Sequence, residues 1–340
     1  MKTKEFDYEI PRHLIAQEPI EPRDHSRLLV LDARSGGIKH KHFYDLLDYL
    51  KKGDVLVLND SRVIKSRLRY TRGLGDEVVI LLLKQLSDKV WEFLLEFGTL
   101  DVNEHLVFSP YSPYLEGLIV ELGVIVGKKG ERVGVINFSS DNFLDNLGET
   151  PIPPYIHGYK GSPERYQTVY SLVKGSSAAP TAGLHFTPEL LRSIEDTGVK
   201  LCFTTLHVSI DTFMPIIEDN IEDHIIHKEF VSISKEYCEI LNNRKGRIIC
   251  VGTTTVRVLE QIKGKFGEFK PWEGWADVYI TPGHKFCMEG LITNFHYPRS
   301  TNIVMVSSFA GWDLLMRAYE EAFNMRYRLY SFGDAMLILK

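Results

Sequence analysis

The sequence predicts an α/β protein with a largely parallel sheet or barrel, interrupted by a small all-β domain. Strand and helix patterns alternate after residue 199, and an α/β pattern also precedes residue 67. Between residues 67 and 150, short β-rich segments follow one another without a long helical pattern. Alternation is typical of parallel sheets, and a series of short strands is typical of a barrel or sandwich. We therefore expect a main domain of residues 1–66 and 151–340 and an inserted domain of residues 67–150.

Composition limits the class of protein. The 340 residues suffice for about two domains, and 44% hydrophobic with 25% charged residues is typical of a soluble globular chain. No apolar run reaches the roughly 20 residues of a membrane helix, and no signal peptide is evident, so we expect a cytoplasmic protein without membrane contact. The net charge of −5 argues against nucleic-acid binding through overall charge but leaves a local basic patch open. Four widely spaced cysteines predict neither a zinc cluster nor a disulfide framework.

The individual elements follow from local patterns. Residues 28–32 and 38–42 flank a Ser-Gly-Gly turn and predict a hairpin, and the apolar run 54–59 predicts a buried parallel strand. Residues 302–310 are ambiguous, because β-branched residues compete with a helical cap at Thr301. The remaining predictions are helices at 43–50, 188–197, 235–244, 254–262 and 312–327 and strands at 78–83, 90–95, 105–108, 118–126, 132–138, 199–207, 247–251 and 276–281.

Residues 175–191 are the most informative stretch. From Gly175 to Gly183 every residue is small or proline, so the backbone can approach a ligand closely. Thr187 is a typical N-cap before Pro188, and a helix should begin there. This loop of small residues is followed directly by His185 and by a helix N-terminus. The succession predicts a pocket for a small polar or anionic ligand. The alternative is a tight loop in which His185 is a satisfied core residue.

Polar residues follow several predicted strands. Asn59-Asp60-Ser61-Arg62 follows the strand 54–59, where an α/β fold places its ligands, although the same residues are also ordinary turn formers. His207 ends another strand, and a run of threonines leads from residue 253 to Arg257, which is either a ligand contact or a surface residue. A fourth strand ends at Thr293-Asn-Phe-His296.

Other motifs are absent or incomplete. Asp223, His224 and His227 have types found in transition-metal sites, but no closed ligand set accompanies them, so we expect no metal. The sequence has no Walker A motif, no GxGxxG after a strand and no GxSxG elbow, which counts against nucleotide hydrolysis and hydride transfer.

Taken together, the motifs resemble one known family over nearly the whole chain. They include Asn59-Asp-Ser-Arg-Val-Ile64, Glu164-Arg-Tyr-Gln-Thr-Val-Tyr170, Ala178-Ala-Pro-Thr-Ala-Gly-Leu-His-Phe-Thr187, Val251-Gly-Thr-Thr-Thr-Val-Arg257 and Leu291-Ile-Thr-Asn-Phe-His296. The sequence resembles the S-adenosylmethionine:tRNA ribosyltransferase-isomerases of queuosine biosynthesis. The resemblance implies a barrel-like α/β catalytic domain with an inserted, Greek-key-like β-barrel.

The resemblance also implies an activity. S-Adenosylmethionine would donate its ribosyl group to 7-aminomethyl-7-deazaguanine at the tRNA wobble position, giving epoxyqueuosine-tRNA, adenine and methionine. S-Adenosylmethionine is then a co-substrate, no separate cofactor is expected, and tRNA is the macromolecular partner of a monomer.

On this basis we predict site residues. His185 and His207 are expected to transfer protons, because imidazole titrates near neutral pH, and Asp60 to position ribose hydroxyls or the amine. Arg257 is expected to bind the methionyl carboxylate. The predicted substrate-binding residues are Asn59, Arg62, Thr181, Gly183, Thr254, Arg257 and His296. Arg67 and Arg165, with Arg62, are expected to contact tRNA, the alternative being ordinary surface ion pairs.

One segment departs from the family pattern. The family usually has His-Val-Gly-x-Gly-Thr-Phe, whereas this chain has His207-Val-Ser-Ile-Asp-Thr-Phe213, with Ser209 and Asp211 at the glycine positions. This departure leaves open a catalytically silent tRNA-binding protein. A separate alternative is an S-adenosylmethionine-dependent RNA methyltransferase, which uses the same donor. The missing glycine-rich nucleotide motif counts against the methyltransferase.

Overall fold

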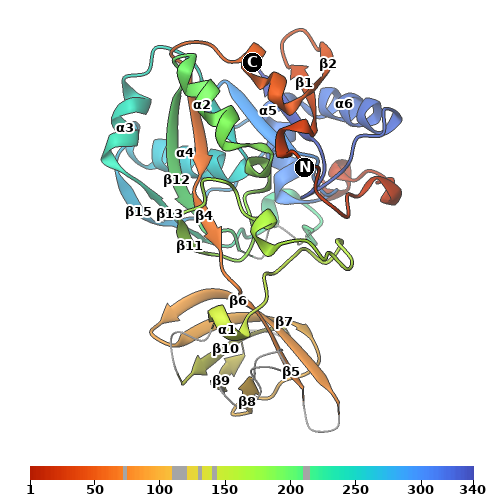
Figure 1. Cartoon of the computed structure of the whole chain (residues 1–340), viewed down its shortest axis with the longest axis vertical. Helices are drawn as coiled ribbons and strands as arrows, with labels where there is room; N and C mark the ends of the chain where they lie inside the picture. The colour runs from red at the N-terminus through yellow and green to blue at the C-terminus, as the bar shows by residue number, and fades with distance from the viewer. Residues whose placement is uncertain (72–74, 109–120, 129–131, 140–143, 210–214) are drawn as a thin grey trace. The chain divides into compact units, whose positions relative to one another are not determined.

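The computed structural model describes residues 1–71, 75–108, 121–128, 132–139, 144–209 and 215–340 (Figure 1). It divides into two compact units. The first comprises Met1–Arg62, Pro153–Val173 and Ala179–Lys340, and the second Val63–Ile152 and Lys174–Ala178. The second unit takes in Lys174–Ala178, which the predicted division placed with the main domain. Ser176 and Ser177 explain this, because Ser176 O accepts from Ile64 N at 3.0 Å and Ser177 Oγ donates to Leu82 O at 2.9 Å.

A nine-stranded sheet forms the centre of the first unit (Figure 1). Its order is β15-β13-β12-β3-β14-β16-β17-β1-β2. The strands are β1 Arg27–Asp32, β2 Ile38–His42, β3 Val55–Asn59, β12 Lys200–Leu206, β13 Glu229–Ile233, β14 Ile248–Val251, β15 Trp272–Ala276, β16 Gly290–Asn294 and β17 Ala335–Leu339. Two further short strands, β4 Ser61–Val63 and β11 Val173–Ser176, lie where the sequence ranges of the two units meet.

The strand directions correct one expectation. β12, β3, β14 and β16 run parallel in the middle of the sheet, and β17 and β1 are also parallel. The pairs β15·β13, β13·β12, β16·β17 and β1·β2 are antiparallel, so the sheet is mixed rather than largely parallel. For β1·β2 the reason is local, since a short turn can join only antiparallel strands. The predicted hairpin and the buried parallel strand β3 are confirmed.

Most helices begin and end near their predicted limits. Thr187 caps α2, since its Oγ1 accepts from Leu190 N at 3.1 Å, and the chain leaves the helix at Gly198 with φ of 86°. The ambiguous segment 302–310 is helical and its cap is Ser300, whose Oγ accepts from Ile303 N at 3.2 Å. A helix apolar on all sides is stable when it is buried, as this one is. The helices are α2 Pro188–Asp196, α3 Lys235–Asn242, α4 Thr253–Phe266, α5 Thr301–Ala310 and α6 Trp312–Asn324.

The strand predicted at 276–281 is wrong in position. The strand is β15, Trp272–Ala276, which pairs with β13 along the sheet edge. Ile280 is instead buried outside any strand. Neither β13 nor β17 was predicted, because each is identified by its partner strand more than by its own short pattern. The predicted helix 43–50 is a 3₁₀ helix, Phe43–Tyr49.

Apolar side chains hold one face of the sheet to its covering helices. Leu56, Leu58 and Val251 of the sheet pack with Leu190 and Ile194 of α2 in one buried cluster. Burial of each such side chain contributes about 1.5–3 kcal/mol. This core fixes the strands whose ends form the site.

The second unit has a six-stranded antiparallel sheet with the order β5-β6-β7-β10-β9-β8. Strands β5 and β8, at the two ends of this order, contact each other, so the sheet is nearly closed. The predicted strands at 78–83, 90–95, 105–108 and 132–138 are confirmed, and 118–126 is confirmed for the part that is described. The elements are β5 Arg67–Thr71, β6 Glu77–Ser87, β7 Val90–Phe97, β8 His105–Phe108, β9 Glu121–Lys128, β10 Val133–Phe138 and the short helix α1 Leu144–Leu147.

Candidate active site

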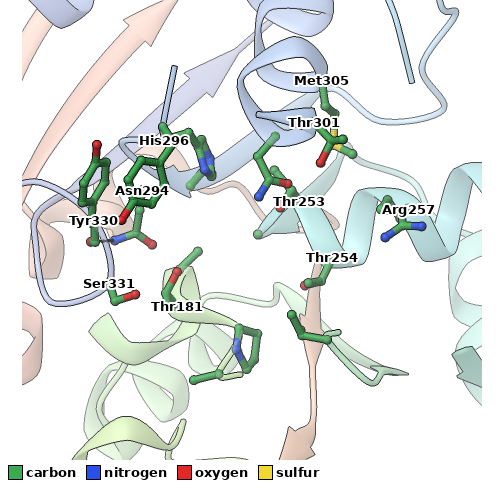
Figure 2. A pocket seen from close by; sticks show the side chains of 18 of the residues that line it. Thr181, Thr253, Thr254, Arg257, Asn294, His296, Thr301, Met305, Tyr330 and Ser331 are labelled. Atoms are coloured by element: carbon green, nitrogen blue, oxygen red, sulfur yellow. Dashed lines mark hydrogen bonds between the residues drawn. The ribbon is translucent and has the colours of Figure 1, made fainter. Parts of the chain in front are cut away.

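A pocket in the first unit lies where segments distant in the sequence meet (Figure 2). It is lined by residues from the stretches 179–182, 252–257, 293–297, 301–305 and 330–331. The neighbouring strands β14 and β16 are parallel, so their carboxyl ends lie at the same edge of the sheet, and both ends contribute to the lining. This is the usual ligand position in α/β folds.

Two helices begin at the pocket. Thr253 and Thr254 start α4, and Thr301 starts α5; all three side chains appear together in Figure 2. Gly252 makes the turn from β14 into α4 with φ of 88°, a conformation that a side chain would strain. Helix N-termini carry unpaired amides and partial positive charge, so this side of the pocket favours an anionic group.

Arg257, one turn into α4, reaches the pocket wall as part of a buried ion pair. Its Nη1 donates to Glu229 Oε2, and its Nη2 donates to His227 O at 3.3 Å. Arg257 Nε is buried without a partner within the described part of the chain. Glu229 also accepts from Ser209 N at 2.8 Å, so the carboxylate links the arginine to the segment that follows β12.

His296 follows β16 and lines the pocket. Its Nε2 lies 2.6 Å from Thr293 Oγ1, and its backbone N–H donates to Tyr319 Oη at 3.0 Å. Burial lowers the pKa of His296 to about 4. The imidazole is therefore neutral at pH 7, and one of its ring nitrogens is unprotonated.

Three tyrosines form an aromatic wall. The rings of Tyr297 and Tyr330 stack with centroids 4.0 Å apart, and Tyr155 lies 5.4 Å and 5.0 Å from them. Burial raises the pKa of each phenol, so all three stay neutral. Such faces suit the stacking of a planar base.

His185 lies behind the pocket rather than in its lining. Its Nδ1 is 2.7 Å from Ser26 Oγ, its Nε2 is 3.2 Å from Asn294 Nδ2, and its ring stacks on Phe43 at 5.0 Å. Burial, with the charges of three arginines, lowers the pKa of His185 to about 3. The side chain is thus a satisfied, neutral core imidazole that contacts a pocket residue, Asn294.

His207 and Asp60 also lie outside the described lining, although Val208 belongs to it. The His207 ring stacks on Phe230 with centroids 5.5 Å apart, and burial lowers its pKa. Asp60 Oδ1 accepts from Thr205 Oγ1 at 2.7 Å, and burial raises the pKa of this carboxyl.

Of the predicted substrate-binding residues, the structure brings four together in the lining: Thr181, Thr254, Arg257 and His296. Asn59 is instead occupied within the protein, since its Oδ1 accepts from Ser61 N and Leu206 N and its Nδ2 donates to Leu206 O. A side chain at Gly183 would meet Tyr170 Oη at 2.1 Å. Packing against Tyr170 is therefore enough to require a glycine there.

The three predicted tRNA-contacting arginines all have carboxylate partners. Arg62 binds both oxygens of Glu164, at 3.0 Å and 2.6 Å. Arg67, in the second unit, binds Glu96 in the same way at 2.6 Å and 2.9 Å. Arg165 pairs with Glu21 and donates to Ile20 O at 2.9 Å, while its Nη1 is buried without a partner in the described residues.

Sequence reasoning missed Glu229 and Asn294. Asn294 belongs to the motif Thr293-Asn-Phe-His296, so its position at a strand end was a usable signal. Glu229 starts the unpredicted strand β13, and no signal in the sequence pointed to it. At the two departures from the family pattern, Ser209 N donates to Glu229 Oε1, and Asp211 lies outside the described residues.

Two further findings bear on the class of protein. Within the described ranges, no group of three or more histidine, cysteine or acidic residues is placed to hold a metal ion. Asp223, His224 and His227 therefore do not form such a group. None of the described helices is long and apolar enough to cross a membrane.

The fold and pocket define a mixed α/β protein with a polar, aromatic-walled site at strand ends. Residues 3–338 match the family model described as queuosine biosynthesis protein. The chain therefore belongs to the queuosine biosynthesis protein family.

Individual relatives agree with this assignment. The chain is 45% identical to the S-adenosylmethionine:tRNA ribosyltransferase-isomerase of Dehalococcoides mccartyi (strain CBDB1), with 100% of both chains covered. It is 46% identical to the protein of that name from Caldanaerobacter subterraneus subsp. tengcongensis, again with 100% of both chains covered. Among solved structures, it is similar to the S-adenosylmethionine tRNA ribosyltransferase of Thermotoga maritima, with a TM-score of 0.56, 36% identity and coverage of 98% of this chain and 100% of that one.

Proposed function

We propose that the chain transfers and isomerises the ribosyl group of S-adenosylmethionine onto 7-aminomethyl-7-deazaguanine at the tRNA wobble position. The products are epoxyqueuosine-tRNA, adenine and methionine. The observation that carries this proposal is the full-length match to relatives named for this activity. Because the proposed substrate is tRNA, we place the enzyme in the cytoplasm. We also propose that it acts as a monomer and uses no separate cofactor.

The first unit is the proposed catalytic domain, and the six-stranded sheet is the proposed insertion. In the order β7-β10-β9-β8, the consecutive strands β8, β9 and β10 bring β10 back beside β7. This order supports a Greek-key-like barrel, because β7 lies beside β10, the last of the consecutive strands β8, β9 and β10, rather than beside β8, which follows it in the sequence.

The pocket chemistry suits an extended S-adenosylmethionine. Thr254 Oγ1 is buried and has no partner in the described chain, and it lies at the N-terminal end of α4 near Arg257. A methionyl carboxylate there would receive hydrogen bonds from Thr254 Oγ1, helix amides and Arg257 Nε. Thr181, which lies between Ser331 and Thr254 in the view of Figure 2, would contact the sugar.

The proposed reaction begins at the methylene beside the sulfonium. The positive sulfur acidifies this group, a base removes a proton, and elimination expels adenine. The amine of 7-aminomethyl-7-deazaguanine then adds to the sugar, and methionine leaves as the epoxide closes. These steps require a neutral base and a proton donor for adenine inside a site that holds little water.

His296 is the imidazole in the pocket lining, so we propose it as a proton-transfer group together with His207. The test is turnover of His185→Gln, His207→Gln and His296→Gln with intact modified tRNA. Loss of a general base lowers kcat by about 10²–10⁴. If His185→Gln and His207→Gln both keep near-wild-type turnover, the predicted assignment to those two residues is wrong and His296 remains.

For tRNA, we propose a phosphate contact around Arg165. Burial and the nearby Arg165 charge lower the pKa of Arg23 to about 10, and burial, with a smaller contribution from Arg165, lowers the pKa of Arg328. Arg23 and Arg328 therefore both lie within electrostatic range of Arg165, and a phosphate would offset the repulsion. Arg62 is held by Glu164, and Arg67, in the second unit, is held by Glu96.

The function is tested by one mass-spectrometric assay. A modified anticodon stem-loop is incubated with S-adenosylmethionine labelled in its methyl group. The expected result is a mass gain on the RNA, release of adenine and methionine in equal amounts, and all label in methionine. Label in the RNA would indicate methyl transfer, and RNA binding without adenine release would indicate a silent binding protein; either result overturns the proposal.

A further inference from the structure

Asn294, the last residue of β16, has an amide group whose orientation is fixed by its neighbours. Its Nδ2 lies 3.1 Å from Tyr330 O and 3.4 Å from Asp334 O. Backbone carbonyl oxygens only accept hydrogen bonds, so the NH2 end of the amide must face them. The reverse orientation would place Oδ1 against two carbonyl oxygens. Asn294 Oδ1 therefore points away from both carbonyls.

His185 strengthens this orientation. Its Nε2 also faces Asn294 Nδ2, so Nε2 must be the acceptor and the ring proton must reside on Nδ1. Nδ1–H then donates to Ser26 Oγ, which is buried beside it. A protonated ring would direct an N–H at the amide NH2, and the low pKa of His185 agrees with a ring that stays neutral.

The oxygen of this fixed amide has no hydrogen-bond donor among the described residues. Asn294 is only 4% exposed, it lines the pocket, and its Oδ1 is a buried acceptor without a partner in the described residues. Buried polar atoms are nearly always paired, because an unpaired one keeps the cost of its lost hydration. An acceptor left open at a pocket wall is suited to an N–H group of a ligand.

The surroundings indicate which N–H group fits. The stacked rings of Tyr297 and Tyr330, with Tyr155, adjoin Asn294 in the lining, which suits a planar base. Among the described lining residues the carboxylate is Glu229, and it already binds Arg257, so no negative charge is left to attract an ammonium. A neutral ring amine matches an amide acceptor beside this aromatic wall.

The pocket also has two ends. In Figure 2, Asn294 and Tyr330 lie on one side, and Thr254 and Arg257 lie on the other. An extended S-adenosylmethionine has its carboxylate and its adenine at opposite ends. A carboxylate at Thr254 and Arg257 therefore directs the adenine toward Asn294.

We propose that Asn294 Oδ1 accepts a hydrogen bond from the exocyclic amine of the adenine ring of S-adenosylmethionine, and that His185 is the positioning residue that holds this acceptor in place. The inference rests on the proposed function. It makes Asn294 a specificity-determining residue for the donor nucleoside, and it gives His185 a role that requires no change in its protonation.

The experiment measures binding by calorimetry, without tRNA or turnover. The ligands are S-adenosylmethionine and its analogue in which the 6-amino group is replaced by hydrogen. Wild-type protein is expected to bind the analogue roughly tenfold to hundredfold more weakly, the range for one lost hydrogen bond to a buried group. In Asn294→Ser the two ligands should bind within about threefold of each other, because the acceptor is gone.

A pair of variants at His185 keeps the test valid if Asn294→Ser does not fold. His185→Gln can still present an oxygen to Asn294 Nδ2, so the preference for the 6-amino ligand should persist. His185→Ala removes that acceptor and should reduce the preference, but by less than Asn294→Ser, because Tyr330 O and Asp334 O still hold Nδ2. Asn242→Ser is the matched control: the Asn242 amide is fully paired with the Phe269 backbone away from the pocket, and its loss should leave the preference intact.

The outcomes separate this inference from the proposed function. If the protein does not bind S-adenosylmethionine, the proposed function fails. If it binds both ligands equally, the donor function stands and the role of Asn294 is overturned. If Asn294→Ser instead weakens binding of the modified stem-loop and leaves the ligand preference unchanged, the acceptor recognises the tRNA base, which also overturns the inference.

Discussion

Arg257 and Glu229 form an ion pair inside the pocket wall, with side chains only 8% and 3% exposed. The pair joins the first turn of α4 to the start of β13, and Ser209 N extends it to the segment after β12. A buried pair of this kind contributes little net stability but is costly to break, because the remaining partner keeps an uncompensated charge.

Glu229→Gln should therefore destabilise the protein. The expected loss is about 3–5 kcal/mol in the free energy of unfolding, since Arg257 would stay buried without its counter-charge. Urea denaturation measures it. Glu189→Gln, which breaks the exposed Arg192–Glu189 pair, is the control and should change little. An equal loss of unfolding free energy in the two variants would show that breaking the buried pair costs no more than breaking the exposed one.

The buried imidazole of His185 should make stability depend on pH. Its pKa is about 3 in the folded state and about 6.5 when unfolded, so between these values only the unfolded state binds the proton. Stability is then complete above pH 6.5 and is lost as pH falls, by about 2 kcal/mol at pH 5. His185→Gln should remove this part of the slope between pH 7 and pH 5. The exposed His13→Gln should retain it, and a slope unchanged in His185→Gln would contradict the assignment.

Thr254→Val tests the anionic end of the pocket. The substitution keeps the shape of the side chain but removes the hydroxyl at the start of α4. Affinity for S-adenosylmethionine should fall roughly tenfold or more, because the lost donor served a charged carboxylate. Calorimetry measures the affinity, and Thr197→Val at the end of α2 is the control. Unchanged affinity would place the carboxylate elsewhere.

Arg165→Gln tests the proposed phosphate contact. Loss of one contact should weaken tRNA binding and reduce the slope of log K against log salt by about 0.7–0.9. Filter binding of tRNA at salt concentrations from roughly 50 to 200 mM measures this slope. Arg192→Gln, on the exposed face of α2, should leave the slope unchanged. A slope equal to the wild-type value in Arg165→Gln would leave Arg165 as a structural partner of Glu21 only.

Local chemistry predicted much of the fold. The cap at Thr187, the stop at Gly198, the hairpin β1–β2 and the apolar strand β3 depend on neighbouring residues and on backbone preferences, so they can be recognised in the sequence. Strands β13 and β17 could not, because a short strand is defined by the partner that completes its hydrogen bonds, and that partner is remote in the sequence.

The sequence by itself determined the family, the α/β pattern of one unit and the all-β pattern of the other. It also identified the motifs that contain the pocket residues Thr254, Arg257 and His296. Only the tertiary structure decided what each polar strand end does. Asn59 and Asn294 both end central strands, yet Asn59 is saturated by the backbone of Leu206 and Ser61, whereas Asn294 lines the pocket and its Oδ1 is buried without a partner in the described residues. The reason is that each of these amides has a hydrogen-bond partner more than a hundred residues away, Leu206 for Asn59 and His185 for Asn294, and only the fold brings these residues together.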